Sequence, residues 1–223
     1  MNDIISDIIG YDVRSVSPSW LKSEWDIKSR EQFLLRPEIT CPFSVDFSVW
    51  PTLFKLGQND TKIIAANNAI IVDPGIAAWH FKTFRLWPDL GGMLAEYKPT
   101  PDHDWGIAVG LIRLETYPPE ASPIQDSWRR AILGSPINPA TKQSSWKLLG
   151  YDVANSGFTS AISNCGMSEK ERRELRPVWG HLLGDNGLFQ TVQDAIRFNA
   201  DANKRLSPDG PFYVFELFLL WNT

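Results

Sequence analysis

The alternation of hydrophobic and polar residues predicts strands in several parts of the chain. Residues 45–49 alternate with a period of two, as in a half-buried strand. Residues 105–116 form the clearest strand in the middle of the chain, and 212–221 is apolar on both faces, which is typical of a central strand covered on each side. Further strands are expected at 8–16 and 146–151, and at 62–66 and 69–72 with Asn67-Asn68 as a tight turn between them; a continuous helix through 62–72 is the competing interpretation.

Helices are indicated by capping residues ahead of apolar residues at helical spacing. Capping boxes stand at 122–125, opening a helix that ends at Gly134, and at 168–171. The second opens a highly charged helix in which Glu169 and Arg173 are one turn apart.

Other helices are indicated by similar signals along the chain. Pro177 is expected to end or kink the charged helix. Thr191 is expected to cap a further helix, a surface helix is expected over 20–35, and another helix is expected from Pro74 to about Leu86. The inward residues of the helix after Thr191 are expected to be Val192, Ala195, Ile196 and Ala202.

These elements predict an α+β fold, with helices packed on a mostly antiparallel sheet and the last strand deep inside. The chain has 223 residues, 43% of them hydrophobic and ten of them tryptophan, which is enough apolar material for one large core. We therefore expect a single domain spanning residues 1–223.

The tetrapeptide Gly-Tyr-Asp-Val occurs twice, at 10–13 and at 150–153, each time after two aliphatic residues. A repeat would indicate a duplicated unit, but the residues on either side do not match further. We interpret the two copies as similar strand ends and not as a duplicated domain.

One face of the strand at 105–116 is made of small residues. Gly106, Ala108 and Gly110 leave room for another group to approach the backbone closely. A helix packed there is the commoner outcome, and a small-molecule ligand over these residues is the alternative.

Acidic residues near aromatic residues and prolines mark two loops as candidate contacts with a protein partner. The net charge is −4, which argues against general affinity for nucleic acid but suits a basic protein surface. The candidate partner-binding residues are Asp102, His103, Asp104, Trp105, Glu115, Glu120 and Asp126.

Four residues are the candidates for catalysis if the protein is an enzyme, a hydrolase or a transferase: Asp152, Cys165, His181 and Glu216. Asp152 is expected to follow a strand and to hold a turn by accepting backbone N–H bonds. Glu216 interrupts an apolar strand, so that a partner such as an arginine is expected. Cys165 has no histidine close in sequence, and we interpret it as a small packing residue.

No metal or cofactor site is predicted. The three histidines are isolated from one another, no glycine loop has the spacing that holds a phosphate, and Asp185-Asn186-Gly187 lacks the spaced acids of a calcium loop. Cys41 and Cys165 give neither a disulfide framework nor a thiolate zinc site. The absence of a signal peptide and of a long apolar run predicts a cytoplasmic protein without a membrane span.

The last third of the chain carries a resemblance to a known group of proteins. The segments WKLLGYDVANSGFTSAISNCG, NGLFQTVQDAIRFNADANKRL and PFYVFELFLLW, within residues 146–221, resemble immunity proteins of bacterial polymorphic-toxin and contact-dependent growth inhibition systems. The resemblance implies a cytoplasmic protein that binds one cognate toxin domain and blocks it without catalysis. We take this function as the expectation, with an enzyme and a small-molecule binding module as the alternatives.

Overall fold

The computed structural model describes residues 6–15, 35–36, 86–96, 104–114, 142–155, 158–162, 168–205 and 210–222. Several expected elements lie outside the described residues: the strand at 45–49, the hairpin at 62–72, the helix at 122–134, and, apart from their last residues, the helices over 20–35 and 74–86.

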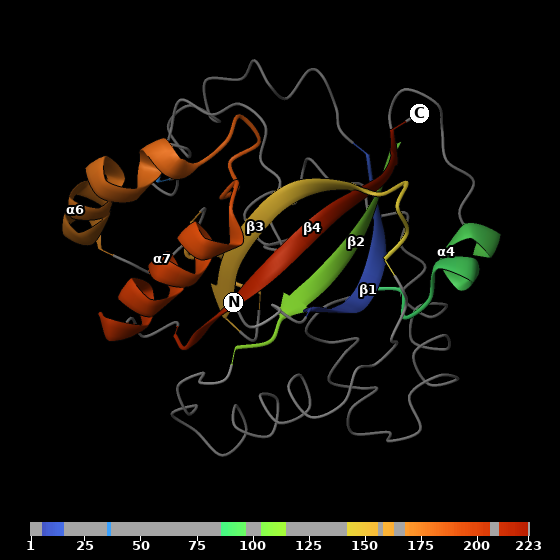
Figure 1. Cartoon of the computed structure of the whole chain (residues 1–223), viewed down its shortest axis with the longest axis horizontal. Helices are drawn as coiled ribbons and strands as arrows, with labels where there is room; N and C mark the ends of the chain where they lie inside the picture. Colours follow the sequence, from blue (N-terminus) through green and yellow to red (C-terminus); the bar gives the residue numbers. More distant parts are fainter. Residues whose placement is uncertain are drawn as a thin grey trace. The chain divides into compact units, whose positions relative to one another are not determined.

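The described strands form a four-stranded antiparallel sheet, which confirms the α+β fold class. Its order is β1-β2-β4-β3, so β4 lies inside the sheet and β1 and β3 stand at the two ends (Figure 1). The register of β1 and β2 runs from Ser6 opposite Ile112 to Ser15 opposite Asp104. The strands are β1 Ser6–Ser15, β2 Asp104–Ile112, β3 Lys147–Asn155 and β4 Phe212–Asn222.

The strand at the end of the chain is as central as its sequence predicts. All residues of 211–219 are buried, because β4 has a neighbour on each side and apolar residues on both faces. Two asparagines of the preceding helix hold its first residue: Asn203 accepts from the N–H of Phe212 at 2.7 Å, and Asn199 donates to its carbonyl at 2.6 Å. The strand therefore starts at a defined place against the helix.

Both helix starts expected after residue 150 are confirmed. Helix α6, Glu169–Trp179, begins with a complete capping box between Ser168 and Glu171. Helix α7, Val192–Lys204, begins at Thr191, whose hydroxyl accepts from the N–H of Asp194 at 3.1 Å. Side-chain acceptors at these positions satisfy backbone donors that the first turn of a helix leaves free.

Three features of the described elements differ from the expectations. Pro177 was expected to end or kink α6; the helix does not end there but continues to Trp179 before the short 3₁₀ helix η2, Gly180–Leu182, and a kink stays a prediction. The strand expected at 146–151 runs on to Asn155, so both Gly-Tyr-Asp-Val copies lie inside strands and not at their ends. Helix α4, Leu90–Glu96, was not predicted, because two of its seven residues are glycine, a poor helix former.

The contacts divide the chain into two compact units, and β4 contributes to both. The first comprises residues Met1–Val16, Phe54–Leu148 and Leu217–Thr223, and the second comprises Ser17–Leu53 and Leu149–Glu216. A single undivided domain stays a prediction.

In the first unit, a buried cluster joins β1, β2, α4 and the end of β4. Trp146 stands edge-on to Tyr11 and tilted against Phe218, with ring centroids 6.1 Å apart in both pairs. Lys142 lies over the ring of Phe218, 5.2 Å from its centroid. The buried members of the cluster are Ile8, Tyr11, Val13, Trp87, Met93, Ala108 and Phe218.

In the second unit, aromatic rings connect α6, α7 and the segment between them. Trp179, Phe189 and Phe198 form a triangle with centroid distances of 5.2 to 6.4 Å. Helix α7 turns Ala195, Phe198, Asn199 and Ala202 inward, so the expected inward residues Ala195 and Ala202 are buried while Val192 and Ile196 are half-buried.

Candidate functional site

Asp152 is a fully buried carboxylate at the centre of a small hydrogen-bond network. Its Oδ1 accepts from the N–H of Val153 at 2.8 Å and from the hydroxyl of Ser160 at 2.6 Å. The Ser160 hydroxyl oxygen in turn accepts from the N–H of Ile162 at 3.1 Å. Asp152 thus accepts a backbone bond as expected, but from inside strand β3, where it ties the returning segment 158–162 to the strand.

Asn155 does the turn-holding work that the sequence assigned to Asp152. Its Oδ1 and backbone carbonyl accept from the N–H groups of Thr159 and Phe158, at 2.8 and 3.0 Å. Phe158 has a φ of 62°, a conformation that needs such local support in a residue other than glycine. Because β3 is longer than predicted, the turn begins at Asn155, the last residue of the strand, and not at Asp152.

Glu216 is only 3% exposed, in the middle of β4. Burial, and secondarily the charge of Glu216, raise the pKa of the Tyr151 hydroxyl above its ordinary value. The arginine partner expected for Glu216 stays a prediction.

His181 differs from these two buried carboxylates in its exposure to solvent. It is exposed in η2, where its charge contributes, after Thr191 and Arg197, to the lowered pKa of Asp194. Asp152 and Glu216 are in the interior and His181 is on the surface, so these three do not form one site open to substrate. Cys165 lies outside the described residues.

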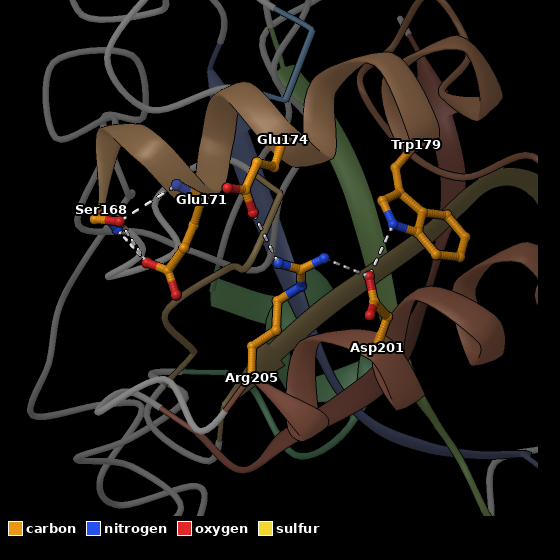
Figure 2. Close-up of polar contacts among 6 residues, drawn as sticks. All are labelled: Ser168, Glu171, Glu174, Trp179, Asp201 and Arg205. Carbon is orange, nitrogen blue, oxygen red and sulfur yellow. Dashed lines mark hydrogen bonds and ion pairs between the residues drawn. The ribbon is translucent and has the colours of Figure 1, made fainter.

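A polar cluster between α6 and α7 was missed at the sequence level. Asp201 accepts from the indole N–H of Trp179 at 3.1 Å and from Arg205 at 3.5 Å, and Arg205 also reaches Glu174 at 3.6 Å (Figure 2). We call Glu174, Trp179, Asp201 and Arg205 the helix clasp. Only the spacing of Asp201 and Arg205, one helical turn apart, could have been read from the sequence.

The helix clasp is a structural device. Its charges are between 30 and 52% exposed, so each ion pair is weak by itself. The Arg205 Nε is buried without a hydrogen-bond partner, which adds a cost. The cluster holds the two helices together through one tryptophan and one shared carboxylate.

Only two of the candidate partner-binding residues are described. Asp104 and Trp105 begin β2, where they lie opposite Ser15 and Arg14 at the end of β1, and Trp105 is half-buried. The other candidates, Asp102, His103, Glu115, Glu120 and Asp126, lie outside the described residues.

The small-residue face of β2 is met by a tryptophan of the same unit. A Cβ on Gly106 would lie 2.5 Å from ring atoms of Trp221, and Ala108 belongs to the buried cluster. The group that approaches Gly106 is thus neither the helix nor the ligand that the sequence suggested. Contact with an indole of β4 is invisible to local pattern, because the two residues are far apart in the chain.

Neither a metal centre nor a membrane helix is found within the described ranges. No three residues of the metal-binding types gather there, and no described helix has the length and apolar character needed to cross a membrane.

The chain matches no protein-family model, no curated protein and no solved structure. What it does must therefore be inferred from its own residues. It is an α+β protein whose buried carboxylates Asp152 and Glu216 lie in strands, and the last two residues of its acidic segment 102–105 begin β2.

Proposed function

We propose that the protein is a cytoplasmic immunity protein that binds one cognate toxin domain and neutralises it without catalysis. The observation that supports this proposal is the use of Asp152. Its carboxylate is wholly buried and bonded to Val153 and Ser160, so one of the four candidate catalytic residues holds the fold. The resemblance of residues 146–221 to immunity proteins favours the same function.

The surface we propose for toxin binding is the acidic segment 102–105, which was expected as a loop and whose last two residues, Asp104 and Trp105, begin β2. Strand pairing with Arg14 and Ser15 fixes the place at which this loop joins the sheet, and a loop carried by a rigid strand is a common position for binding residues. The acids Asp102 and Asp104 would attract a basic surface, such as that of a nuclease, and speed its association.

The second candidate loop, 115–126, follows the opposite end of β2. A strand of nine residues is about 30 Å long at about 3.4 Å per residue. The two ends of β2, one next to each candidate segment, are therefore separated by about the diameter of a small domain. The loops should be tested separately before they are treated as one surface.

The first experiment is an affinity purification from cells that also express the toxin. The tag belongs at the N-terminus, because β4 extends to Asn222 and a C-terminal tag would adjoin a buried strand. We expect one partner in near-equimolar amount, a toxic domain whose activity is lost on titration with this protein. A protein that neither retains nor inhibits such a domain would contradict the proposal.

The second experiment locates the contact by charge reversal. Asp102→Lys combined with Asp104→Lys should slow association about tenfold at low salt and less at high salt. Asp185→Lys, at an exposed position in a turn, is the matched control and should leave the rate unchanged. If reversal of this loop and, separately, of Glu115, Glu120 and Asp126 has no effect, these loops are not the toxin-binding surface.

A further inference from the structure

The two Gly-Tyr-Asp-Val copies occupy equivalent places in the sheet. Residues 10–13 lie in β1 and residues 150–153 in β3, the strands at the two ends of the order β1-β2-β4-β3. Each of these strands pairs with the other described strand of its own half of the chain, β1 with β2 and β3 with β4. From either end of the sheet, the outer strand is therefore the first described strand of its half of the chain, and its neighbour is the second.

The tyrosine of each copy pairs with an aromatic residue on the outer side of its strand. Tyr11 and Trp87 exchange both backbone hydrogen bonds, at 2.8 and 2.9 Å. Tyr151 and Phe189 exchange the same two bonds, at 2.9 and 3.0 Å, and both bridges are antiparallel. Each bridge satisfies the backbone groups that the tyrosine would otherwise turn outward from the sheet.

The glycine of each copy makes room for the same pair of neighbours. A Cβ on Gly10 would lie 2.6 Å from the Cβ of Leu86 and 3.0 Å from the carbonyl oxygen of Trp87. A Cβ on Gly150 would lie 2.8 Å from the Cβ of Leu188 and 2.7 Å from the carbonyl oxygen of Phe189. In both places a leucine-aromatic dipeptide crosses the strand too closely for any side chain.

The segment after each dipeptide is also equivalent. Helices α4 and α7 each begin at the third residue after the aromatic residue. In both, the residue before the helix accepts from the N–H three positions on: Asp89 from Gly92 at 2.6 Å, and Thr191 from Asp194 at 3.1 Å. The helix then leads to the strand that pairs with the Gly-Tyr-Asp-Val strand.

We propose that the chain contains two copies of one strand–dipeptide–helix–strand unit, and that the leucine-aromatic dipeptide of each copy is a clip that closes one edge of the sheet. The edge clips are Leu86-Trp87 on Gly10-Tyr11 and Leu188-Phe189 on Gly150-Tyr151. This replaces the interpretation of the two tetrapeptides as similar strand ends without duplication, because the bridges, the glycine contacts and the helix starts match although the surrounding sequence does not.

The two glycines allow the edge clips to cross the strands closely, and this role is structural and not catalytic. An uncovered edge strand offers free N–H and C=O groups to a strand of another molecule. A dipeptide bonded across the edge removes that opportunity at the tyrosine. Release of a clip would therefore open β1 or β3 to strand addition by a second copy of this chain.

Amide hydrogen exchange of the full-length protein, resolved by residue, tests the clips. In the wild type we expect the amides of Tyr11, Trp87, Tyr151 and Phe189 to be protected to a similar degree. Gly10→Ala should accelerate exchange at the first clip by about 10- to 100-fold and leave the second unchanged, with the reverse for Gly150→Ala. Gly150 has a φ of 144°, so its substitution is strained twice over.

Light scattering on the same samples tests the closing of the edges. Each clip variant should show a higher mass than the wild type as concentration rises. Gly91→Ala is the matched control, because a Cβ on this exposed helical glycine would meet only the Asp89 side chain, at 3.3 Å, and it should alter neither exchange nor mass.

Three results would overturn the proposal. Wild-type amides at a dipeptide that exchange as fast as those of an unstructured peptide would remove that clip, and this measurement needs no variant to fold. Protection of only one dipeptide would contradict the equivalence of the two copies. Clip variants that open by exchange yet keep the wild-type mass would show that the clips do not guard the edges.

Discussion

A fully buried carboxylate is tolerated only where donors surround it. Asp152 accepts from the N–H of Val153 and from the hydroxyl of Ser160, and the Ser160 oxygen in turn accepts from the N–H of Ile162. The bond from the hydroxyl brings Ser160, eight residues further along the chain, back to the strand. The buried acid that the sequence marked as unusual is thus part of the packing.

We expect Asp152→Ala to destabilise the protein by about 3 kcal/mol, because it leaves the buried Ser160 hydroxyl and a buried N–H without their acceptor. Ser160→Ala should cost less, about 1 to 2 kcal/mol. Urea unfolding of both variants measures the difference. Asp185→Asn, at an exposed position, is the control and should stay within about 0.5 kcal/mol of the wild type. Equal stability of Asp152→Ala and wild type would refute the structural role.

The contact between Gly106 and Trp221 makes a second prediction at the scale of single residues. Gly106→Ala should destabilise by about 1 to 3 kcal/mol, because its Cβ would overlap the indole ring. In a Trp221→Phe background the ring is shorter, so the same alanine should cost less. A double-mutant cycle in urea measures this coupling; strictly additive effects would mean that Trp221 does not fill the space over Gly106.

At the scale of elements, the helix starts follow local chemistry. Ser168 and Thr191 cap α6 and α7 as their spacing predicts, since an N-cap needs only residues within one turn. Helix α4 shows the limit of this rule. Its cap, Asp89, precedes Gly91 and Gly92, and glycine has a low helix propensity. The helix forms nonetheless, and its Met93 packs in the buried cluster of the first unit.

The capping interactions predict how stability depends on pH. Hydrogen bonds from Ser168 and from Thr191 lower the pKa values of Glu171 and Asp194 below their ordinary values of 4.5 and 3.8. A carboxyl group whose pKa is lower in the folded state contributes stability above its ordinary pKa and loses it as the pH falls through the folded pKa. The melting temperature should therefore fall as pH decreases below about 4.5.

Removal of the cap separates this contribution from other carboxyl groups. Ser168→Ala should cost about 1 kcal/mol at pH 7 and less at pH 3, where Glu171 is increasingly protonated. Thermal unfolding at several pH values gives the comparison. Ser145→Ala, exposed in a turn, should change stability at neither pH. A Ser168→Ala loss that does not shrink on acidification would argue that Glu171 plays no part in the box.

At the scale of the whole molecule, the sheet is organised around β4. It is the only described strand near the C-terminus, yet it pairs with both β2 and β3, and its faces bury residues in each compact unit. Phe215 packs edge-to-face on Phe158 with centroids 5.0 Å apart. Substitutions of the buried apolar residues of this strand should therefore destabilise the protein far more than apolar substitutions at exposed positions.

Phe215→Ala should destabilise by about 3 to 5 kcal/mol, because it removes a buried ring and its aromatic partner's contact. Leu94→Ala is the contrasting apolar change, since Leu94 is 45% exposed on α4, and it should cost under about 1 kcal/mol. Chemical denaturation compares the two. Similar losses for both would contradict the central position of β4.

Local pattern was enough for the strands at the start, middle and end of the chain and for two capped helices. Period-two alternation, apolar runs and capping spacings involve residues near one another, and their physics does not depend on the rest of the fold. The same reasoning found Asp152 and Glu216 as unusual acids. It placed Asp152 after its strand because the strand's true end, at Asn155, depends on a bridge to Ser160.

Tertiary structure alone decided the rest. Whether the acids were buried or accessible, which side chain filled the space over Gly106, and why glycine precedes tyrosine in both tetrapeptides each depend on contacts between distant residues. The sequence by itself determined where the described strands and the two capped helices α6 and α7 form, because those preferences are local. Their pairing into β1-β2-β4-β3, with Trp87 and Phe189 across the outer strands, required the folded chain, since backbone groups select partners by position in space and carry no mark in the sequence.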